Sequence, residues 1–168
     1  MNEQDYFSLF GLTRAFAIAP ADLESAWKRV SLAVHPDRFA TASAAEKRVA
    51  MQWSARANEA YRVLKNPLLR ARYLCELAGL DLQIETNTAM SPAFLMQQME
   101  WHEQLDDLQS HPNTEKQAAF AAELHLELSQ HIKQVEDLLD TNNYNEAAVR
   151  IREWMFLDKL IAQLSAID

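Results

Sequence analysis

The sequence has 168 residues, a formal net charge of −8 and a single cysteine, Cys75. One cysteine cannot form an internal disulfide or, by itself, hold a structural zinc ion or an iron–sulfur cluster. An acidic chain with two glycines also lacks the clustered cations of a nucleic-acid binder and the glycine-rich loop of a nucleotide-binding enzyme. We therefore expect a mainly helical protein that holds no metal or cofactor.

The charge is divided unevenly along the chain. Residues 1–78 carry 11 Lys/Arg and 8 Asp/Glu, a net of +3, whereas residues 79–168 carry 5 and 16, a net of −11. Together with the polar stretch after Gly79, this contrast predicts two domains, 1–78 and 91–168, joined by a linker over 79–90. The acidic start of the chain and the absence of an apolar run of roughly 20 residues predict a cytoplasmic protein that does not enter a membrane.

The first domain is expected to contain a helical hairpin. A helix is predicted to begin at Pro20, because proline is favoured in the first turn. It ends at His35, because the residue before a proline, here Pro36, is disfavoured in helical conformation. The second helix of the hairpin is predicted over about 43–64, and a shorter helix follows Pro67.

The second domain reads as three helices, over 91–110, 114–141 and 144–166. The connections between them are short, which predicts an antiparallel three-helix bundle. His131 shares the apolar face of the second of these helices, so we expect it to pack in the core rather than to bind a metal. Cys75 is expected to be a small buried residue.

The tripeptide His35-Pro36-Asp37 lies at the tip of the predicted hairpin. By itself it is a helix stop followed by a turn. In this sequence, however, it stands between three longer segments: Asp5-Tyr6-Phe7-Ser8-Leu9-Phe10-Gly11-Leu12, Asn58-Glu59-Ala60-Tyr61-Arg62-Val63-Leu64 and Asn66-Pro67-Leu68-Leu69-Arg70-Ala71-Arg72-Tyr73-Leu74. This order and spacing resemble those of a J-domain.

Further segments, over 68–79, 94–100 and 152–160, are similar to the HscB family, the J-domain co-chaperones of bacterial iron–sulfur cluster assembly. The resemblance covers nearly the whole chain. It implies an all-α protein with an N-terminal J-domain, in which short helices flank a helical hairpin, and a C-terminal antiparallel three-helix bundle. It also implies a protein that is not an enzyme itself but changes the ATPase rate of a partner.

In this family the His-Pro-Asp loop docks on HscA, a DnaK-class ATPase chaperone. Carried over to this chain, the resemblance implies chaperone binding by His35, Pro36 and Asp37. Proline fixes a rigid corner there, and a carboxylate can accept charge-assisted hydrogen bonds from a partner arginine. Positive charge near the tip, which we expect to assist this docking, comes from Lys28, Arg29 and Arg38.

A helical wheel of about 100° per residue divides the helix over 91–110 into two faces. The stripe expected to face the bundle core comprises Phe94, Gln98, Trp101, Leu105 and Leu108. The residues that fall away from it are Leu95, Met96, Met99, Glu100, Glu103 and Asp107. An exposed apolar cluster rimmed by charge is typical of a partner site, and methionine suits an adaptable one.

The resemblance implies that these six residues, together with Phe156, bind the cluster scaffold protein IscU. Phe156 lies about 120° from the main apolar stripe of the last helix, so it could join the exposed cluster. Alternatively, Leu95, Met99 and Phe156 pack at the margins of the bundle or against the J-domain.

Two alternative functions stay open at this point. One is a general J-domain co-chaperone that delivers unfolded clients to a DnaK-type chaperone. The other is a helical enzyme or passive adaptor in which residues 35–37 are only a turn.

Overall fold

The computed structural model describes residues 4–82 and 90–167, and all regular elements in those ranges are helices. The chain divides into two compact units, Met1–Leu74 and Cys75–Asp168. The all-α fold predicted from the sequence is confirmed. The finer division into 1–78, a linker over 79–90 and 91–168 stays a prediction, and residues 83–89 of that linker lie outside the described residues.

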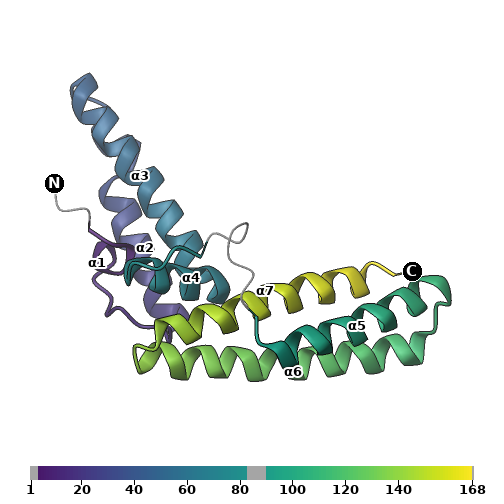
Figure 1. Ribbon diagram of the computed structural model, residues 1–168. Coiled ribbons are helices and arrows are strands. Elements are labelled where there is room, and N and C mark those ends of the chain that lie inside the picture. Colours follow the sequence, from purple (N-terminus) through teal and green to yellow (C-terminus); the bar gives the residue numbers. More distant parts are fainter. Residues whose placement is uncertain (1–3, 83–89, 168) are drawn as a thin grey trace. The chain divides into compact units, whose positions relative to one another are not determined.

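The first unit is built around the hairpin of α2 (Pro20–Ala33) and α3 (Ala44–Lys65), shown in Figure 1. The helices can approach closely because small residues face the neighbouring helix, and Ala26, Ala57 and Ala60 are almost completely buried. The Trp27 indole stacks on Tyr61 with ring centroids 4.7 Å apart.

Trp53 of α3 is 39 % exposed. Trp27 donates a hydrogen bond to Asn58 and stacks on Tyr61. Because the two helices are antiparallel, Trp53 lies opposite the C-terminal end of α2. Fewer residues of α2 are available there to cover it.

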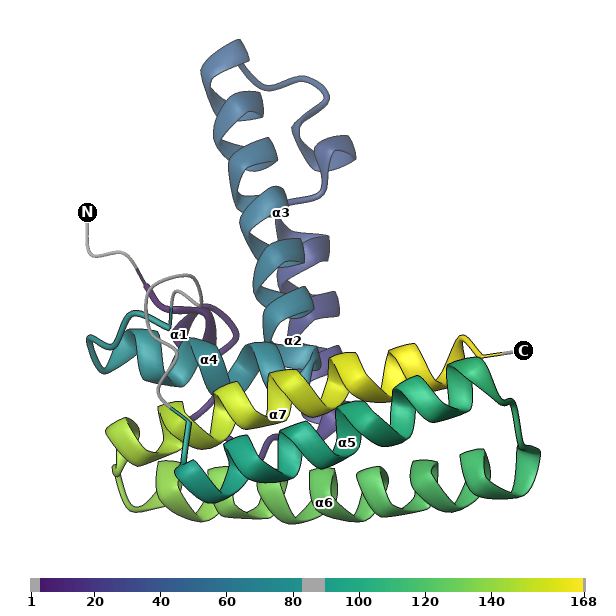
Figure 2. The ribbon, with the colours of Figure 1, turned by 45° about the vertical axis from the view of Figure 1, so that its right-hand side comes forward.

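Three shorter elements complete this part of the chain: α1 (Tyr6–Leu9), the 3₁₀ helix η1 (Pro36–Phe39) and α4 (Pro67–Leu77). Figure 2 shows the loop that joins α2 to α3 at the far end of the hairpin. Ser43 and Glu46 form a capping box that fixes where α3 begins. Asn66 adopts an extended conformation before Pro67 and so separates α3 from α4.

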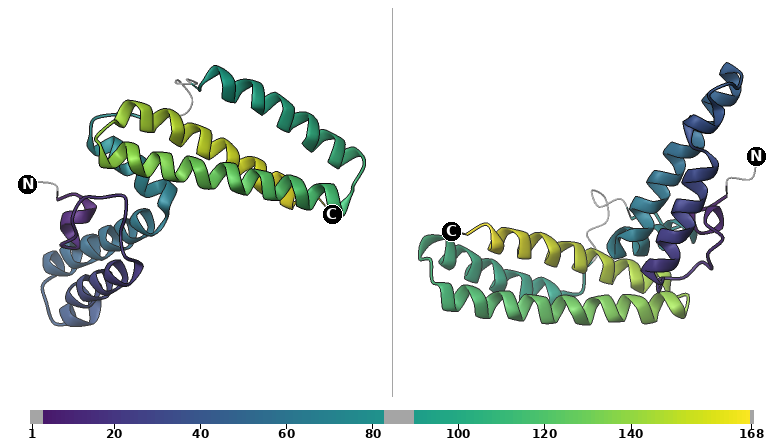
Figure 3. Two further views of the ribbon diagram at one scale, coloured as in Figure 1. Left: turned by 90° about the horizontal axis from the view of Figure 1, so that it is seen from below. Right: turned by 180° about the vertical axis from the view of Figure 1, so that it is seen from behind.

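The second unit contains three long helices, α5 (Pro92–Ser110), α6 (Thr114–Asp140) and α7 (Tyr144–Ser165), close to the predicted bounds. Ala147 and Ala148 are buried, which allows α6 and α7 to pack tightly. The Cα atoms of α5 rarely come within 8 Å of those of α6 or α7, and Figure 3 shows α5 set apart from this pair. The intervening space is filled by large side chains, including Phe94, Trp101 and Leu105.

A buried ionic cluster connects all three helices of the bundle. The Glu153 carboxylate, which is 0 % exposed, accepts hydrogen bonds from His131 Nε2 at 2.9 Å and from Arg150 at 2.7 Å. It also accepts from the Ser91 backbone N–H at 3.2 Å and the Ser91 hydroxyl at 3.0 Å. His131 is thus a packed core residue, as predicted, and Cys75 is buried as well.

The cluster changes the pKa values of both Glu153 and His131. Burial alone would raise the pKa of Glu153, but hydrogen bonds from His131, Arg150 and Ser91 lower it to about 2. Burial alone would lower the pKa of His131, but its hydrogen bond to Glu153 reverses this and holds the pKa above its ordinary value of 6.5. The Glu153 contribution to stability is present above the ordinary glutamate pKa of 4.5 and is lost as the pH falls towards 2. The contribution of His131 to stability is complete below pH 6.5. It is lost as the pH rises through the higher pKa that His131 has in the folded state.

We expect Glu153→Gln to lower the free energy of unfolding by about 3 kcal/mol at pH 6, because His131 and Arg150 lose the buried anion that they share. The loss should shrink at pH 3, where the unfolded-state carboxyl is already protonated and the wild-type advantage is smaller. Urea unfolding of both proteins at the two pH values measures this difference. Asp140→Asn, on the exposed end of α6, serves as a control with little effect, and an equal loss at both pH values would contradict the assignment.

Candidate functional site

The tip of the α2–α3 hairpin presents a carboxylate on a fixed turn. His35 is extended, and Pro36 begins the 3₁₀ turn. The His35 Nδ1 accepts a hydrogen bond from the Asp37 backbone N–H at 3.3 Å, which caps that turn. The Asp37 side chain is 92 % exposed, with one oxygen 3.6 Å from His35 Nδ1, so the carboxylate is accessible to hydrogen-bond donors of a partner.

The three predicted basic residues near the tip differ in their contacts. Lys28 forms an ion pair with Glu24 at 2.7 Å, and this hydrogen bond raises the pKa of Lys28. Arg29 donates to the Phe10 carbonyl at 3.2 Å and so ties α2 to the end of α1. Arg38 reaches the Leu32 carbonyl at 3.5 Å. All three are exposed, but Arg29 already has a structural contact within its unit.

The second predicted site lies on α5. Three large apolar side chains are exposed there, Leu95 at 46 %, Met96 at 69 % and Met99 at 67 %; we call them the α5 patch. Ser91 caps the helix by accepting from the Phe94 N–H at 3.3 Å. The patch therefore begins within the first turn of a helix whose start is fixed.

Three acidic residues, Glu100, Glu103 and Asp107, adjoin the α5 patch, and all are exposed; we call them the acidic rim. The Asp107 carboxylate lies 3.5 Å from His111 Nδ1 and 4.0 Å from Lys116 Nζ of α6. Part of its charge is thus neutralised within the bundle.

Phe156 differs from the α5 patch in being half-buried. Its ring meets Phe94 edge-on at 5.7 Å and lies nearly parallel to Trp101 at 6.5 Å. The exposed His102 ring meets it edge-on at 5.5 Å. Phe156 therefore belongs in part to the core and in part to the surface between α5 and α7.

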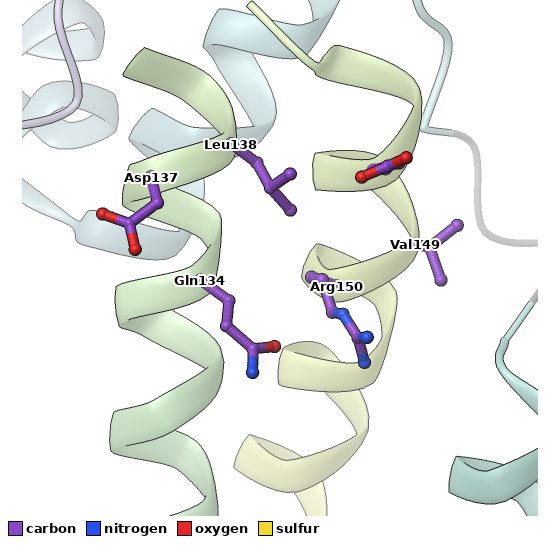
Figure 4. A pocket seen from close by; sticks show the side chains of 6 residues that line it. Gln134, Asp137, Leu138, Val149 and Arg150 are labelled. Atoms are coloured by element: carbon purple, nitrogen blue, oxygen red, sulfur yellow. The ribbon is translucent and has the colours of Figure 1, made fainter. Parts of the chain in front are cut away.

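A groove that the sequence did not predict lies between α6 and α7, and Figure 4 shows Gln134 and Leu138 reaching from α6 towards it. Its other lining residues include Asp137, Val149 and Arg150. Arg150 already holds Glu153. With charges of both signs and its arginine engaged, the groove has no evident preference for one ligand chemistry.

Within residues 4–82 and 90–167, no group of three or more His, Cys, Asp and Glu side chains is arranged to hold a metal ion. The buried Cys75 thiol has a pKa raised to about 11, mainly by burial, so it is a poor nucleophile at neutral pH. Every helix in the same ranges is too short or too polar to cross a bilayer.

Comparison with known proteins gives a consistent result over the full chain. A family model described as the HSCB C-terminal oligomerisation domain matches residues 90–165. The chain is 58 % identical to a co-chaperone protein HscB homolog of Bordetella pertussis, over 99 % of this chain and 97 % of the relative.

Two solved structures have the same fold. The chaperone HscB from Vibrio cholerae matches with a TM-score of 0.82 and 33 % identity, covering 96 % of each chain. The human co-chaperone protein HscB matches with a TM-score of 0.88 over 98 % of this chain and 82 % of that one. The human protein is 24 % identical to this chain, so this likeness is one of fold alone.

The contrast between Phe156 and the α5 patch predicts different effects on stability. Alanine at Leu95, Met96 or Met99 should each change the free energy of unfolding by less than about 0.5 kcal/mol, because these side chains are exposed. Phe156→Ala should cost about 2 kcal/mol, because it removes packing against Phe94 and Trp101. Urea unfolding of the four variants measures the difference, and equal effects at all four positions would contradict it.

Proposed function

This chain belongs to the HscB family of co-chaperones, and from that membership we propose that it links two partners in bacterial iron–sulfur cluster assembly. Its three-helix bundle binds the scaffold protein IscU. Its J-domain brings the scaffold to the DnaK-class chaperone HscA and stimulates ATP hydrolysis there, which promotes cluster transfer. The exchange takes place in the cytoplasm, and the chain supplies no catalytic group of its own.

The observation that carries the proposal is the α5 patch with its acidic rim. Three large apolar side chains are exposed side by side on a helix whose other face already fills the core. Exposed apolar clusters bordered by charge are typical of protein-binding sites. Met96 and Met99 are unbranched and adaptable, and the carboxylates favour a partner with basic groups around an apolar centre.

The hairpin tip is suited to the second partner. Burying a carboxylate against a partner arginine gives a short, directional, charge-assisted interaction. The Asp37 side chain is exposed, and its backbone N–H is already bonded to His35 Nδ1. The turn is therefore held in place before docking, which reduces the entropy lost when the chaperone binds.

Asp37→Asn should abolish stimulation of the HscA ATPase, because the amide lacks the negative charge that a partner arginine would bind. Binding of IscU should be unchanged, since the variant leaves α5 and its surroundings intact. Steady-state ATP hydrolysis by HscA with each variant, and calorimetric titration with IscU, measure the two effects separately.

Asp22→Asn is a matched control, because Asp22 is an exposed acid in the first turn of α2. It should stimulate HscA like the wild-type chain. Full stimulation by Asp37→Asn would refute the co-chaperone mechanism proposed here.

The double variant Leu95→Ala, Met96→Ala should weaken IscU binding at least about tenfold, which corresponds to the loss of about 1.4 kcal/mol of apolar contact. Its unfolding should match that of the wild-type chain. Calorimetric titration with purified IscU checks the affinity. Leu126→Ala is the control, because Leu126 is 62 % exposed on α6 and lies outside the α5 patch.

Unchanged affinity in the double variant would exclude the α5 patch as the scaffold site. Efficient displacement of IscU by an unfolded peptide would favour a general client-binding co-chaperone instead. A small patch with an acidic rim should bind such a peptide weakly, because unfolded clients are best held by a longer apolar groove.

A further inference from the structure

The wide seam between α5 and α7 is closed by aromatic rings. Phe94 and Trp101 of α5 are buried and meet edge-on at 5.7 Å. Phe156 of α7 contacts both rings. The backbones of α6 and α7 pack close together, whereas large rings fill the space between α5 and α7. The outermost of these rings, Phe156, reaches the surface.

His102 covers the outer side of Phe156. The two rings are 5.5 Å apart and inclined by 77°, an edge-on arrangement favourable for aromatic pairs. The His102 side chain itself is exposed. A ring in this position limits the rotation of the half-buried Phe156 side chain.

The angular positions of residues on α5 place this pair beside the α5 patch. At about 100° per residue and counted from Phe94, His102, Leu95 and Met99 fall at about 80°, 100° and 140°. Glu100 and Asp107 fall at about 240° and 220°, and the contact of Asp107 with Lys116 shows that this side faces α6. Glu103 and Met96 fall between these two groups, at about 180° and 200°. The surface is therefore apolar and aromatic on the side towards α7, and on the side towards α6 the acidic side chains surround Met96.

We propose that His102 is an additional docking residue for the scaffold, acting as a positioning residue that holds Phe156 at the edge of the α5 patch. This inference rests on the proposed function and adds an orientation to it. The partner lies across α5 with its apolar or aromatic side chains over Met99, His102 and Phe156. Its basic side chains lie towards Glu100 and Asp107.

Charge argues against a second copy of this chain as the occupant. The C-terminal part, residues 79–168, carries a net charge of −11. Two copies meeting through their acidic rims would repel each other, whereas a basic partner is attracted.

The test compares His102→Ala with His102→Phe in the full-length chain. We expect His102→Ala to weaken IscU binding about fivefold or more, because Phe156 loses its cover, and His102→Phe to restore affinity to within about twofold. Unfolding by urea should be the same for both variants and the wild-type chain, since residue 102 is exposed. Calorimetric titration with purified IscU gives the affinities.

His125→Ala is the matched control. His125 is an exposed histidine on α6 whose ring bonds to the Ala121 carbonyl of its own helix. It lies two residues, or about 200°, from Glu123, which faces Trp101 of α5. Its removal should leave IscU affinity unchanged.

Wild-type affinity in His102→Ala, or no restoration by His102→Phe, would overturn the inference. If Leu95→Ala, Met96→Ala still weakens binding in that case, only the role of His102 fails, and the proposed function stands. Self-association of the chain that His102→Ala abolishes would assign the surface to a second copy and would also overturn the inference.

Discussion

The position of α5 depends on one buried carboxylate. Glu153 of α7 receives hydrogen bonds from His131 of α6 and from both the backbone and the hydroxyl of Ser91. Ser91 in turn caps α5 through the Phe94 N–H. An ionised group without such partners would be too costly to bury, so the three helices meet here in a single arrangement. The positions of the α5 patch and the acidic rim follow from it.

Side-chain size then sets the distances between helices. Alanines bring α2 close to α3 and α6 close to α7, while Phe94 and Trp101 hold α5 further out. The same rings that separate α5 from its neighbours carry Phe156 to the surface. The core and the proposed docking surface therefore share one aromatic layer, and Phe156 lies in both.

Much of the fold could be predicted from the sequence, because prolines and caps mark the helix ends and the apolar period marks their faces. The helices starting at Pro20 and Pro92 are examples. The exposure of Met96 and Met99 also follows from the period of one helix. The assignment of these residues to partners stays a prediction.

Contacts between helices could not be predicted in the same way. A helical wheel gives the direction of a side chain on its own helix but not the distance or the register of the neighbouring one. The pairing of His102 with Phe156, the ion pairs of Asp107 and the bond from Arg29 to Phe10 all depend on that register. The sequence predicts that Arg29 lies near the tip, for example, but only the structure shows its hydrogen bond to the Phe10 carbonyl.

The methionines of the α5 patch sit on a helix that is fixed at its start and packed along its inner face. Such a surface adjusts through side-chain torsions alone, while its backbone stays in place. Little backbone order has to be gained on binding, so the free energy of association is not reduced by a folding step. In the proposed complex, a scaffold that changes shape as its cargo enters or leaves can thus be held by the same helix throughout, because the methionine side chains can change their torsion angles to follow it.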